Sequence, residues 1–296
     1  MTTRAAVPEP GSTGQDPLQG SITSRVISGS VWTLTGYGLS QVLRLASNLV
    51  FAKLLFPEAF ALMALVSVFL QGMAMFSDLG IGASIIQSRH GENPAFLNTA
   101  WTIQVLRGFG LWIVSLICAG PFATLYEEPQ LAALIPVAAI AAIISGFNST
   151  KWFTSNRQIV LARITILEFV SQTIGIVAMV VWCFLSRSVW AMVFGGLIGT
   201  ASKAILSHVA IQGERNRFTF DRAAAYEMTS FGRWVFVSSA LSFLAGQIDR
   251  LMLGKFVPMA MLGLYSIALN LASLPPMVTD SLIGSVLFPL LAHHSR

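Results

Sequence analysis

The amino-acid sequence predicts an all-α polytopic membrane protein with about eight transmembrane helices. We expect one six-helix lobe, followed by the first two helices of a second lobe that repeats the first in parallel. Of the 296 residues, 54% are hydrophobic and only 10% are charged. Soluble domains carry roughly 25% charged residues, so a soluble protein of this size could not cover its surface with so few charges. The composition therefore indicates that lipid is the solvent of this chain.

Eight apolar segments are each long enough to cross the hydrocarbon core of a bilayer, which takes about 20 residues. They span residues 28–55, 60–87, 94–122, 130–152, 158–186, 189–213, 228–256 and 259–292. Several exceed the minimum length, so we expect tilted helices. The short connections carry turn-forming residues, as in FPEAF and YEEPQ.

The polar stretches predict how the chain is divided. The first 23 residues are polar, rich in proline and glycine, and lack the apolar core of a signal peptide. We expect residues 1–23 to form a disordered cytoplasmic tail and 24–213 the six-helix lobe. Residues 214–227 would be a cytoplasmic linker with a short amphipathic stretch, and 228–296 the first two helices of an incomplete second lobe.

The basic residues predict the orientation. If the N-terminus is cytoplasmic, lysines and arginines concentrate on the cytoplasmic side, as the positive-inside rule requires. The net charge of +5 is then an orientation signal, and no basic stretch interleaved with stacking aromatics points to nucleic acid. The cytoplasmic set is Arg4, Arg25, Arg89, Lys151, Arg157, Arg163, Lys203, Arg215, Arg217, Arg222 and Arg296, and the opposite set is Lys53, Arg187, Arg250 and Lys255.

An internal repeat relates the two ends of the chain. Shifting the sequence by 202 positions aligns residues 28–87 with 230–289 without a gap, with about eleven identities. The second copy begins six predicted helices after the first, an even number, so both copies point the same way, as in two-lobed transporters whose halves are related by an axis along the membrane normal. The matched pairs include Trp32 with Trp234, Lys53 with Lys255, and Asp78 with Asp280.

Polar residues recur at helical spacing inside the apolar segments. In the first segment, Gln41, Arg44 and Asn48 are three and four positions apart and so share one helical face. A charge at the bilayer centre costs roughly 2.5–3.5 kcal/mol, so we expect these faces to surround a wet central cavity. The corresponding residues in other segments are Ser67, Gln71 and Asp78; Gln104 and Arg107; Glu168 and Gln172; Ser239, Ser242 and Asp249; and Ser266, Asn270, Ser273 and Asp280.

Each charged residue in these faces has a structural alternative. Arg44 and Arg107 either contact an anionic substrate or are buried cations paired with neighbouring helices. Glu168 fits a cavity position or a polar contact between helices. Asp249 lies near the outer end of its helix, where an interfacial ion-pair network with Arg250 is the default expectation.

Asp78 lies in the stretch FSDLGIGASIIQ, close to Gly80 and Gly82. Glycines let a neighbouring helix approach closely, so we favour a role for Asp78 in bonding across that contact and fixing the cytoplasmic gate. Coupling to a proton or sodium ion is the alternative. Asp280 occupies the same position in the repeat.

No catalytic constellation is visible in the sequence. The four histidines lie at helix ends or in loops, and DLGIG lacks the Lys-Ser/Thr of a phosphate-binding loop. Cys118 and Cys183 lie inside apolar segments and have no metal-ligand spacing. We therefore expect a protein that is not an enzyme and that holds no metal or cofactor.

Five stretches together resemble the polysaccharide transporter branch of the multidrug/oligosaccharidyl-lipid/polysaccharide exporter superfamily. The resemblance covers nearly all of residues 24–289, and it is most specific where Asp249, Gly254, Lys255, Gly263 and Tyr265 fall as that family places them. The stretches are FSDLGIGASIIQ, LNTAWTIQVLRGFGLWIV, ITILEFVSQTIGIVAMVVW, SVWAMVFGG and GQIDRLMLGKFVPMAMLGLYSIALNLASLP.

The resemblance implies a flippase of the bacterial inner membrane with two lobes around a cationic cavity that opens alternately to either side. Its cargo would be an oligosaccharide on polyprenyl pyrophosphate, destined for exopolysaccharide, capsule or lipopolysaccharide O-antigen. Its other partners would be membrane lipids, the polysaccharide polymerase and the chain-length machinery. Arginine suits the pyrophosphate because guanidinium binds phosphate oxygens in a fork. We expect substrate contacts from Arg44, Arg107, Gln41, Asn48, Gln71 and Asn270, and gating or ion coupling from Asp78, Glu168, Asp249 and Asp280.

The chain departs from the family pattern after its eighth segment, where four or more helices of the second lobe are missing. We therefore expect a truncated product, a fragment, or a half that needs a partner. One alternative function is a cation-coupled multidrug exporter of the same superfamily, which predicts an acidic cavity, and the arginines argue against it. A membrane-embedded polymerase or ligase would need a sizeable periplasmic catalytic loop, which the sequence does not contain.

Overall fold

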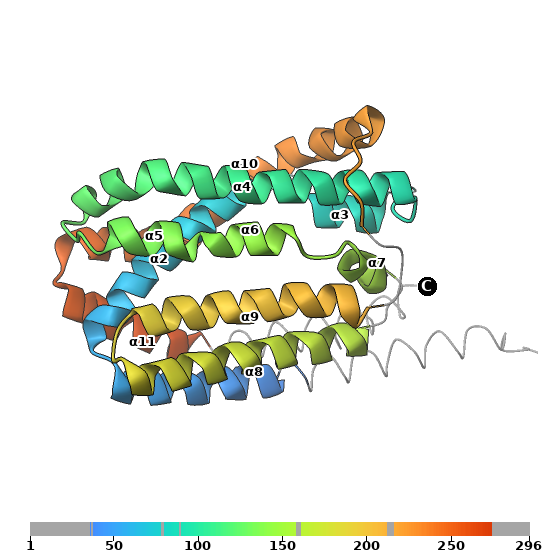
Figure 1. The fold of residues 1–296 in the computed structure, drawn as a ribbon. Helices are drawn as coiled ribbons and strands as arrows, with labels where there is room; N and C mark the ends of the chain where they lie inside the picture. Colours follow the sequence, from blue (N-terminus) through green and yellow to red (C-terminus); the bar gives the residue numbers. More distant parts are fainter. Residues whose placement is uncertain are drawn as a thin grey trace, which may run out of the picture.

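The computed structural model describes residues 36–273, apart from 37, 78–79, 89, 158–160 and 212–215. Its helices lie side by side, and their connections gather at two ends (Figure 1). The connections at 55–56, 126–130, 186–189 and 257–258 form what we call the proline end, and those at 88–93, 147–150 and 210–221 form the linker end. The predicted tail at 1–23 lies outside the described residues.

Helices occur in each of the eight predicted segments where the structure describes them, and the described residues contain no strand, which confirms an all-α polytopic membrane protein. Among the residues that the structure describes, four helices (α2, α4, α8 and α9) are long and apolar enough to cross a membrane, and two shorter apolar stretches span Leu131–Gly146 and Met259–Ala272. A helix over 38–54 is followed by α2 (Pro57–Phe76), α3 (Ile81–Gln87), α4 (Pro94–Leu125), α5 (Leu131–Ala138), α6 (Ile140–Gly146), α7 (Lys151–Arg157), α8 (Leu161–Leu185), α9 (Trp190–Val209), α10 (Arg222–Phe256) and α11 (Met259–Ala272).

Three helix boundaries differ from the prediction. The second segment divides into α2 and α3 before Gly80, whose φ of 63° is a conformation that glycine adopts without strain. The fourth divides at Ala139, three residues after Pro136, which has no N–H for the helical ladder. The seventh begins at Arg222 rather than at residue 228, because the Asp221 side chain accepts hydrogen bonds from the first backbone N–H groups of α10.

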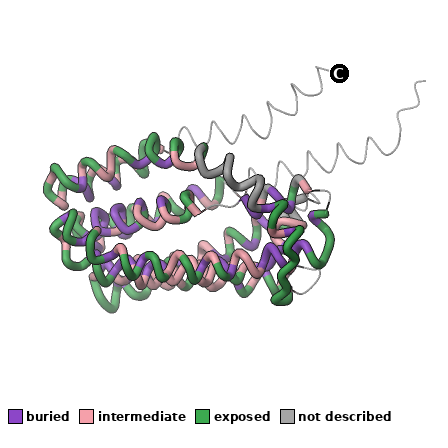
Figure 2. Tube along the Cα trace, turned by 90° about the horizontal axis from the view of Figure 1, so that it is seen from above, coloured by how far each residue is buried: buried purple, intermediate pink, exposed green. Residues whose placement is uncertain are grey.

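The outer faces of the bundle are apolar, as lipid requires. Along α8, Ile166, Ile174, Val177 and Val181 follow one helical face and are 40–55% exposed, whereas Ser171 on the other side is buried. Figure 2 shows exposed positions on the outward sides of the bundle and at both of its ends. This arrangement reverses that of a soluble bundle, in which polar residues face out.

Helix pairs within the first lobe approach closely at glycines. A Cβ atom added at Gly195 of α9 would lie 2.5 Å from the Cβ of Met179 in α8, and one at Gly175 would lie 3.0 Å from the Gly195 carbonyl oxygen. A Cβ at Gly108 of α4 would lie 2.6 Å from the Ala142 carbonyl oxygen in α6. Glycine at these positions therefore lets the backbones of α8 with α9, and of α4 with α6, come into contact.

At the proline end, α10 and α11 are fastened to the first lobe. The Tyr126 hydroxyl donates a hydrogen bond to the Leu251 carbonyl at 3.1 Å. The Lys255 ammonium donates to the Leu125 carbonyl at 2.9 Å and to a Glu127 carboxylate oxygen at 2.8 Å. This hydrogen bond and the charge of Lys255 lower the pKa of the Glu127 carboxyl.

At the linker end, the segment 216–221 is tied along α4. Three α4 side chains accept hydrogen bonds from its backbone N–H groups: Asn98 Oδ1 at 2.9 Å, Thr99 Oγ1 at 3.0 Å and Thr102 Oγ1 at 3.2 Å. The Phe218 ring also packs against Trp101, with 4.6 Å between the ring centroids. The connection between α9 and α10 is thus fixed to α4 over its described length.

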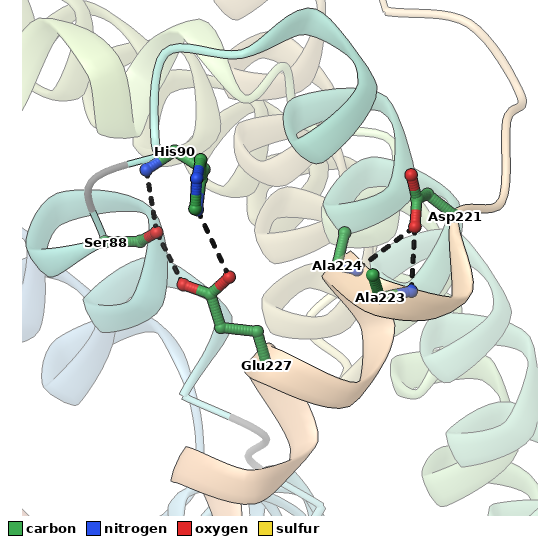
Figure 3. A network of polar contacts seen from close by, with 6 residues as sticks. All are labelled: Ser88, His90, Asp221, Ala223, Ala224 and Glu227. Atoms are coloured by element: carbon green, nitrogen blue, oxygen red, sulfur yellow. Dashed lines mark hydrogen bonds and ion pairs between the residues drawn. The ribbon is translucent and has the colours of Figure 1, made fainter.

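The first turns of α10 make a second contact at this end (Figure 3). The Ser88 hydroxyl donates to one Glu227 carboxylate oxygen at 2.6 Å, and His90 Nδ1 lies 3.5 Å from the other. The backbone N–H of His90 in turn donates to the Ser88 hydroxyl at 3.0 Å. α10 is therefore held to the first lobe at both of its ends.

The close contact between α2 and α11 predicts that a larger residue at Gly263 destabilises the fold. A Cβ at Gly263 would lie 1.9 Å from the Pro57 carbonyl oxygen, so Gly263→Ala must separate the two helices. Overpacking of this kind costs about 1–3 kcal/mol, and each kcal/mol lowers the melting temperature by about 2–4 °C in a chain of this size. Thermal unfolding of the purified protein in detergent measures the loss.

Gly110→Ala is the matched control, because no described residue of another helix has an atom within 4 Å of a Cβ added at that α4 position. It should leave the melting temperature unchanged or raise it slightly, since alanine favours helix over glycine. Equal melting temperatures for the two variants would contradict the role assigned to Gly263.

Candidate substrate cavity

A cavity of about 600 Å³ lies between the helix at 38–54, α8 and α9, with the end of α6 at one side. We call it the polar cavity, because hydroxyl, amide and charged side chains form much of its wall. Glycines of α8 and α9 form another part and leave its space unfilled. The polar residues that line it are Ser40, Gln41, Arg44, Ser145, Asn148, Thr165, Glu168, Ser171, Gln172, Thr200 and Lys203.

Four residues that the sequence placed on polar helical faces meet in this wall. Gln41 and Arg44 come from the helix at 38–54, and Glu168 and Gln172 come from α8. The spacing of three between Gln41 and Arg44 keeps them on one helical face. Asn48 was expected on the same face, but it does not line the cavity.

Lys203 of α9 was missed as a cavity residue, because the sequence analysis used it only to orient the chain. Its ammonium lies 2.9 Å from a carboxylate oxygen of Glu168 and 4.3 Å from the ring centroid of Trp152. Gly196, Thr200 and Lys203 are four and three positions apart and all line the cavity. That spacing was a readable signal of a polar face on α9.

The charges in the polar cavity are two cations and one carboxylate, so its lining carries a net charge of +1. The Asn148 side-chain oxygen is buried and has no hydrogen-bond partner among the described residues. A buried acceptor of this kind costs free energy until a donor reaches it. The wall is therefore suited to an anion that also carries hydroxyl groups.

A second cavity of about 560 Å³ lies between α2, α3, α4 and α6. We call it the apolar cavity, because alanine, leucine, methionine and phenylalanine side chains form most of its wall. Its polar lining includes Gln104 and Arg107, and it shares Ser145 and Asn148 with the polar cavity. The two cavities are thus neighbours within the bundle.

Arg107 closes the end of α2 in addition to lining the apolar cavity. Its Nε donates to the Ser77 hydroxyl at 3.0 Å, and its Nη2 donates to the Ala74 carbonyl at 2.6 Å. A cation at the C-terminal end of a helix is favoured by the helix dipole and by the unpaired carbonyls there. Of the two roles left open by the sequence, this geometry supports the structural one.

The remaining predicted residues that the structure describes line neither cavity. Gln71 accepts a hydrogen bond at 2.9 Å from Gln247, which joins α2 to α10. Asp249 accepts one from the Tyr265 hydroxyl, which joins α10 to α11. Asn270 is exposed on α11. Asp78 and Asp280 lie outside the described residues, so their predicted gating roles stay predictions.

Residues 50–296 match the model of a family described as polysaccharide biosynthesis protein. The chain belongs to this family. The match spans more than four-fifths of the sequence and confirms the resemblance that the motifs carried.

The curated relatives are weakly similar over most of the chain. It is 21% identical to teichuronic acid biosynthesis protein TuaB of Bacillus subtilis over 92% of its length and 56% of the relative. It is 23% identical to lipopolysaccharide biosynthesis protein WzxC of Escherichia coli, over 92% of this chain and 55% of the relative. It is also 23% identical to succinoglycan biosynthesis transport protein ExoT of Rhizobium meliloti, over 90% and 53%. The chain thus spans about half the length of these relatives, and no solved structure matches it.

The contacts of Arg107 predict a loss of stability that needs no substrate. Arg107→Ala removes both hydrogen bonds to the end of α2 and should cost about 1–3 kcal/mol. We expect a lower melting temperature for the purified protein in detergent.

Arg187→Ala provides the comparison, because Arg187 is an exposed cation between α8 and α9 at the proline end. Its melting temperature should equal that of the unaltered protein. If Arg107→Ala also has this melting temperature, the hydrogen bonds to α2 do not stabilise the fold.

Proposed function

We propose that this chain moves oligosaccharide units linked to polyprenyl pyrophosphate across the bacterial inner membrane by alternating access. The units would serve the synthesis of exopolysaccharide, capsule or O-antigen. The observation that carries the proposal is the polar cavity, in which the cations of Arg44 and Lys203 line a space inside an otherwise apolar bundle. The family match supports the same conclusion, since the relatives are named for the biosynthesis or transport of surface polysaccharides.

The pyrophosphate is the part of this cargo that most resists crossing a bilayer. Moving its negative charges through hydrocarbon requires cations in place of water. Arg44 is the first candidate contact, because a guanidinium binds two phosphate oxygens at once. The net charge of +1 along the lining favours an anion at this position.

The sugars require partners for many hydroxyl groups. Gln41, Gln172 and Thr200 bring amides and a hydroxyl to the cavity wall. Asn148 adds a buried oxygen that accepts no hydrogen bond from the described residues, and a sugar hydroxyl would supply the missing donor. These groups bind rather than react, so we infer a transporter and not an enzyme.

We infer that the linker end faces the cytoplasm. Lys151, Arg217 and Arg222 lie there, and the positive-inside rule assigns such residues to the cytoplasmic side. Lipid-linked units made on that side would enter the cavity with the carrier tail left among the membrane lipids. The polymerase and the chain-length machinery would act on the delivered units.

The multidrug exporter is disfavoured by the same charges. A cavity for cationic drugs needs a net negative lining, and the polar cavity has two cations for its one carboxylate. Glu168 is moreover already engaged by Lys203.

Replacement of Arg44 tests the proposal in the source bacterium. Deletion of the gene should leave lipid-linked repeat units on the cytoplasmic leaflet and remove surface polysaccharide. Complementation with Arg44→Gln should give about one-tenth or less of the polysaccharide that the unaltered gene restores. The reason is the loss of a charge-assisted hydrogen bond of about 1.5–3 kcal/mol. Surface polysaccharide and leaflet-resolved lipid-linked units are the measurements.

Arg187→Gln is the matched control, since it removes the same charge at an exposed position outside both cavities. It should complement fully. Normal surface polysaccharide in a clean deletion strain would contradict the proposed function.

A further inference from the structure

We propose that Lys203 is a second pyrophosphate-binding cation of the polar cavity, and that Glu168 neutralises it while the cavity is empty. The proposal rests on the function proposed above and deepens it. It makes Glu168 a competitor of the substrate for one cation, which is a role that neither sequence alternative for this residue contained.

The pair is placed where a substrate anion can reach it. Glu168 projects from α8 and Lys203 from α9, and both line the polar cavity with Arg44. Their side chains are 52% and 33% exposed, and one Glu168 oxygen makes the contact at 2.9 Å. A lysine ammonium has three N–H donors, and among the described residues only this oxygen accepts one. Lys203 is thus held by a single hydrogen bond and still has donors to offer.

The pair is not needed to hold α8 against α9. Those helices already touch through Gly175, Gly195 and Gly199, whose backbones lie within about 3.0–3.3 Å of an added Cβ atom on the facing helix. A partly exposed ion pair shifts an equilibrium by only about 1.4- to 5-fold. The packing contribution of the pair is therefore small, and its position in the cavity wall is its distinguishing property.

Trp152 keeps the ammonium in place when its partner changes. The ring centroid lies 4.3 Å from Lys203 Nζ, within the range of a cation–π contact. The ammonium can thus exchange a carboxylate oxygen for a phosphate oxygen without leaving the ring. A phosphate group carries more charge than a carboxylate and offers more acceptor oxygens, so the exchange favours the bound substrate.

The competition has a use in transport, because a transporter must release what it binds. Two uncompensated cations would hold a pyrophosphate tightly in every conformation. With Glu168 beside it, Lys203 regains a partner as soon as the substrate shifts. The Glu168 carboxylate therefore weakens substrate binding and speeds release. If Glu168 contacted the substrate directly, it would instead strengthen substrate binding.

Binding of farnesyl pyrophosphate to the full chain in detergent tests the exchange, with farnesol as the uncharged comparison. Lys203→Met should weaken binding roughly tenfold, and Lys203→Arg should retain most of it. Glu168→Gln should tighten binding about two- to fivefold by freeing the ammonium. The double variant Glu168→Gln/Lys203→Met should bind like Lys203→Met alone, since the carboxylate acts only through the lysine. Isothermal titration calorimetry gives each dissociation constant.

The two proposals fail in different ways. If Arg44→Gln weakens binding and Lys203→Met does not, the cavity binds the anion but Lys203 takes no part in it. If Glu168→Gln weakens binding or leaves it unchanged, Glu168 is not a competitor, and the exchange is overturned. If neither Arg44→Gln nor Lys203→Met changes binding, the polar cavity is not the pyrophosphate site. The proposed function then loses the observation on which it rests.

A melting curve of each variant without ligand separates binding from folding. The glycine contacts hold α8 against α9 without the ion pair. The Lys203→Met, Lys203→Arg, Glu168→Gln and double variants should therefore melt near the temperature of the unaltered protein. Should Lys203→Met unfold, the comparison of Glu168→Gln with the unaltered protein still decides the sign of the carboxylate's effect.

Discussion

Close backbone contact at glycines is the constraint on which this structure depends. Lipid is as apolar as the side chains it touches, so helices in a bilayer gain little from burying apolar surface against each other and must pack closely instead. Gly195 and Gly175 bring α8 and α9 together, Gly108 does so for α4 and α6, and Gly263 does so for α11 and α2. Each contact involves backbone atoms that cannot move aside, and together they set the positions of the helices.

Two of these glycines, Gly175 and Gly195, also line the polar cavity. A residue without a side chain leaves space on the face that does not touch a neighbour, and glycines of α8 and α9 line that space. The contact also fixes α8 and α9 so that Glu168 and Lys203 meet at 2.9 Å across the cavity wall. Because packing is secured by backbone contacts, the charged side chains remain available for a ligand.

The two ends of the bundle differ in how they hold α10. At the proline end, Lys255 and Tyr126 make three hydrogen bonds that join α10 to the corner between α4 and α5. At the linker end, α4 side chains bind the backbone of the connecting segment, and Glu227 of α10 contacts Ser88 and His90. Any movement of α10 against the helices before it must therefore break polar contacts at one end or bend α10 between them.

The sequence by itself determined the class of the fold, the eight apolar segments and the family, because hydrocarbon thickness and the cost of buried charge act on local composition. It also placed Gln41, Arg44 and Glu168 in a cavity wall, since spacing defines a helical face. Tertiary structure decided which faces meet. Arg107 donates hydrogen bonds to the end of α2 because α4 lies against α2. Lys203 pairs with Glu168 because α9 lies against α8. The spacing of residues along one helix does not reveal which helix lies beside it.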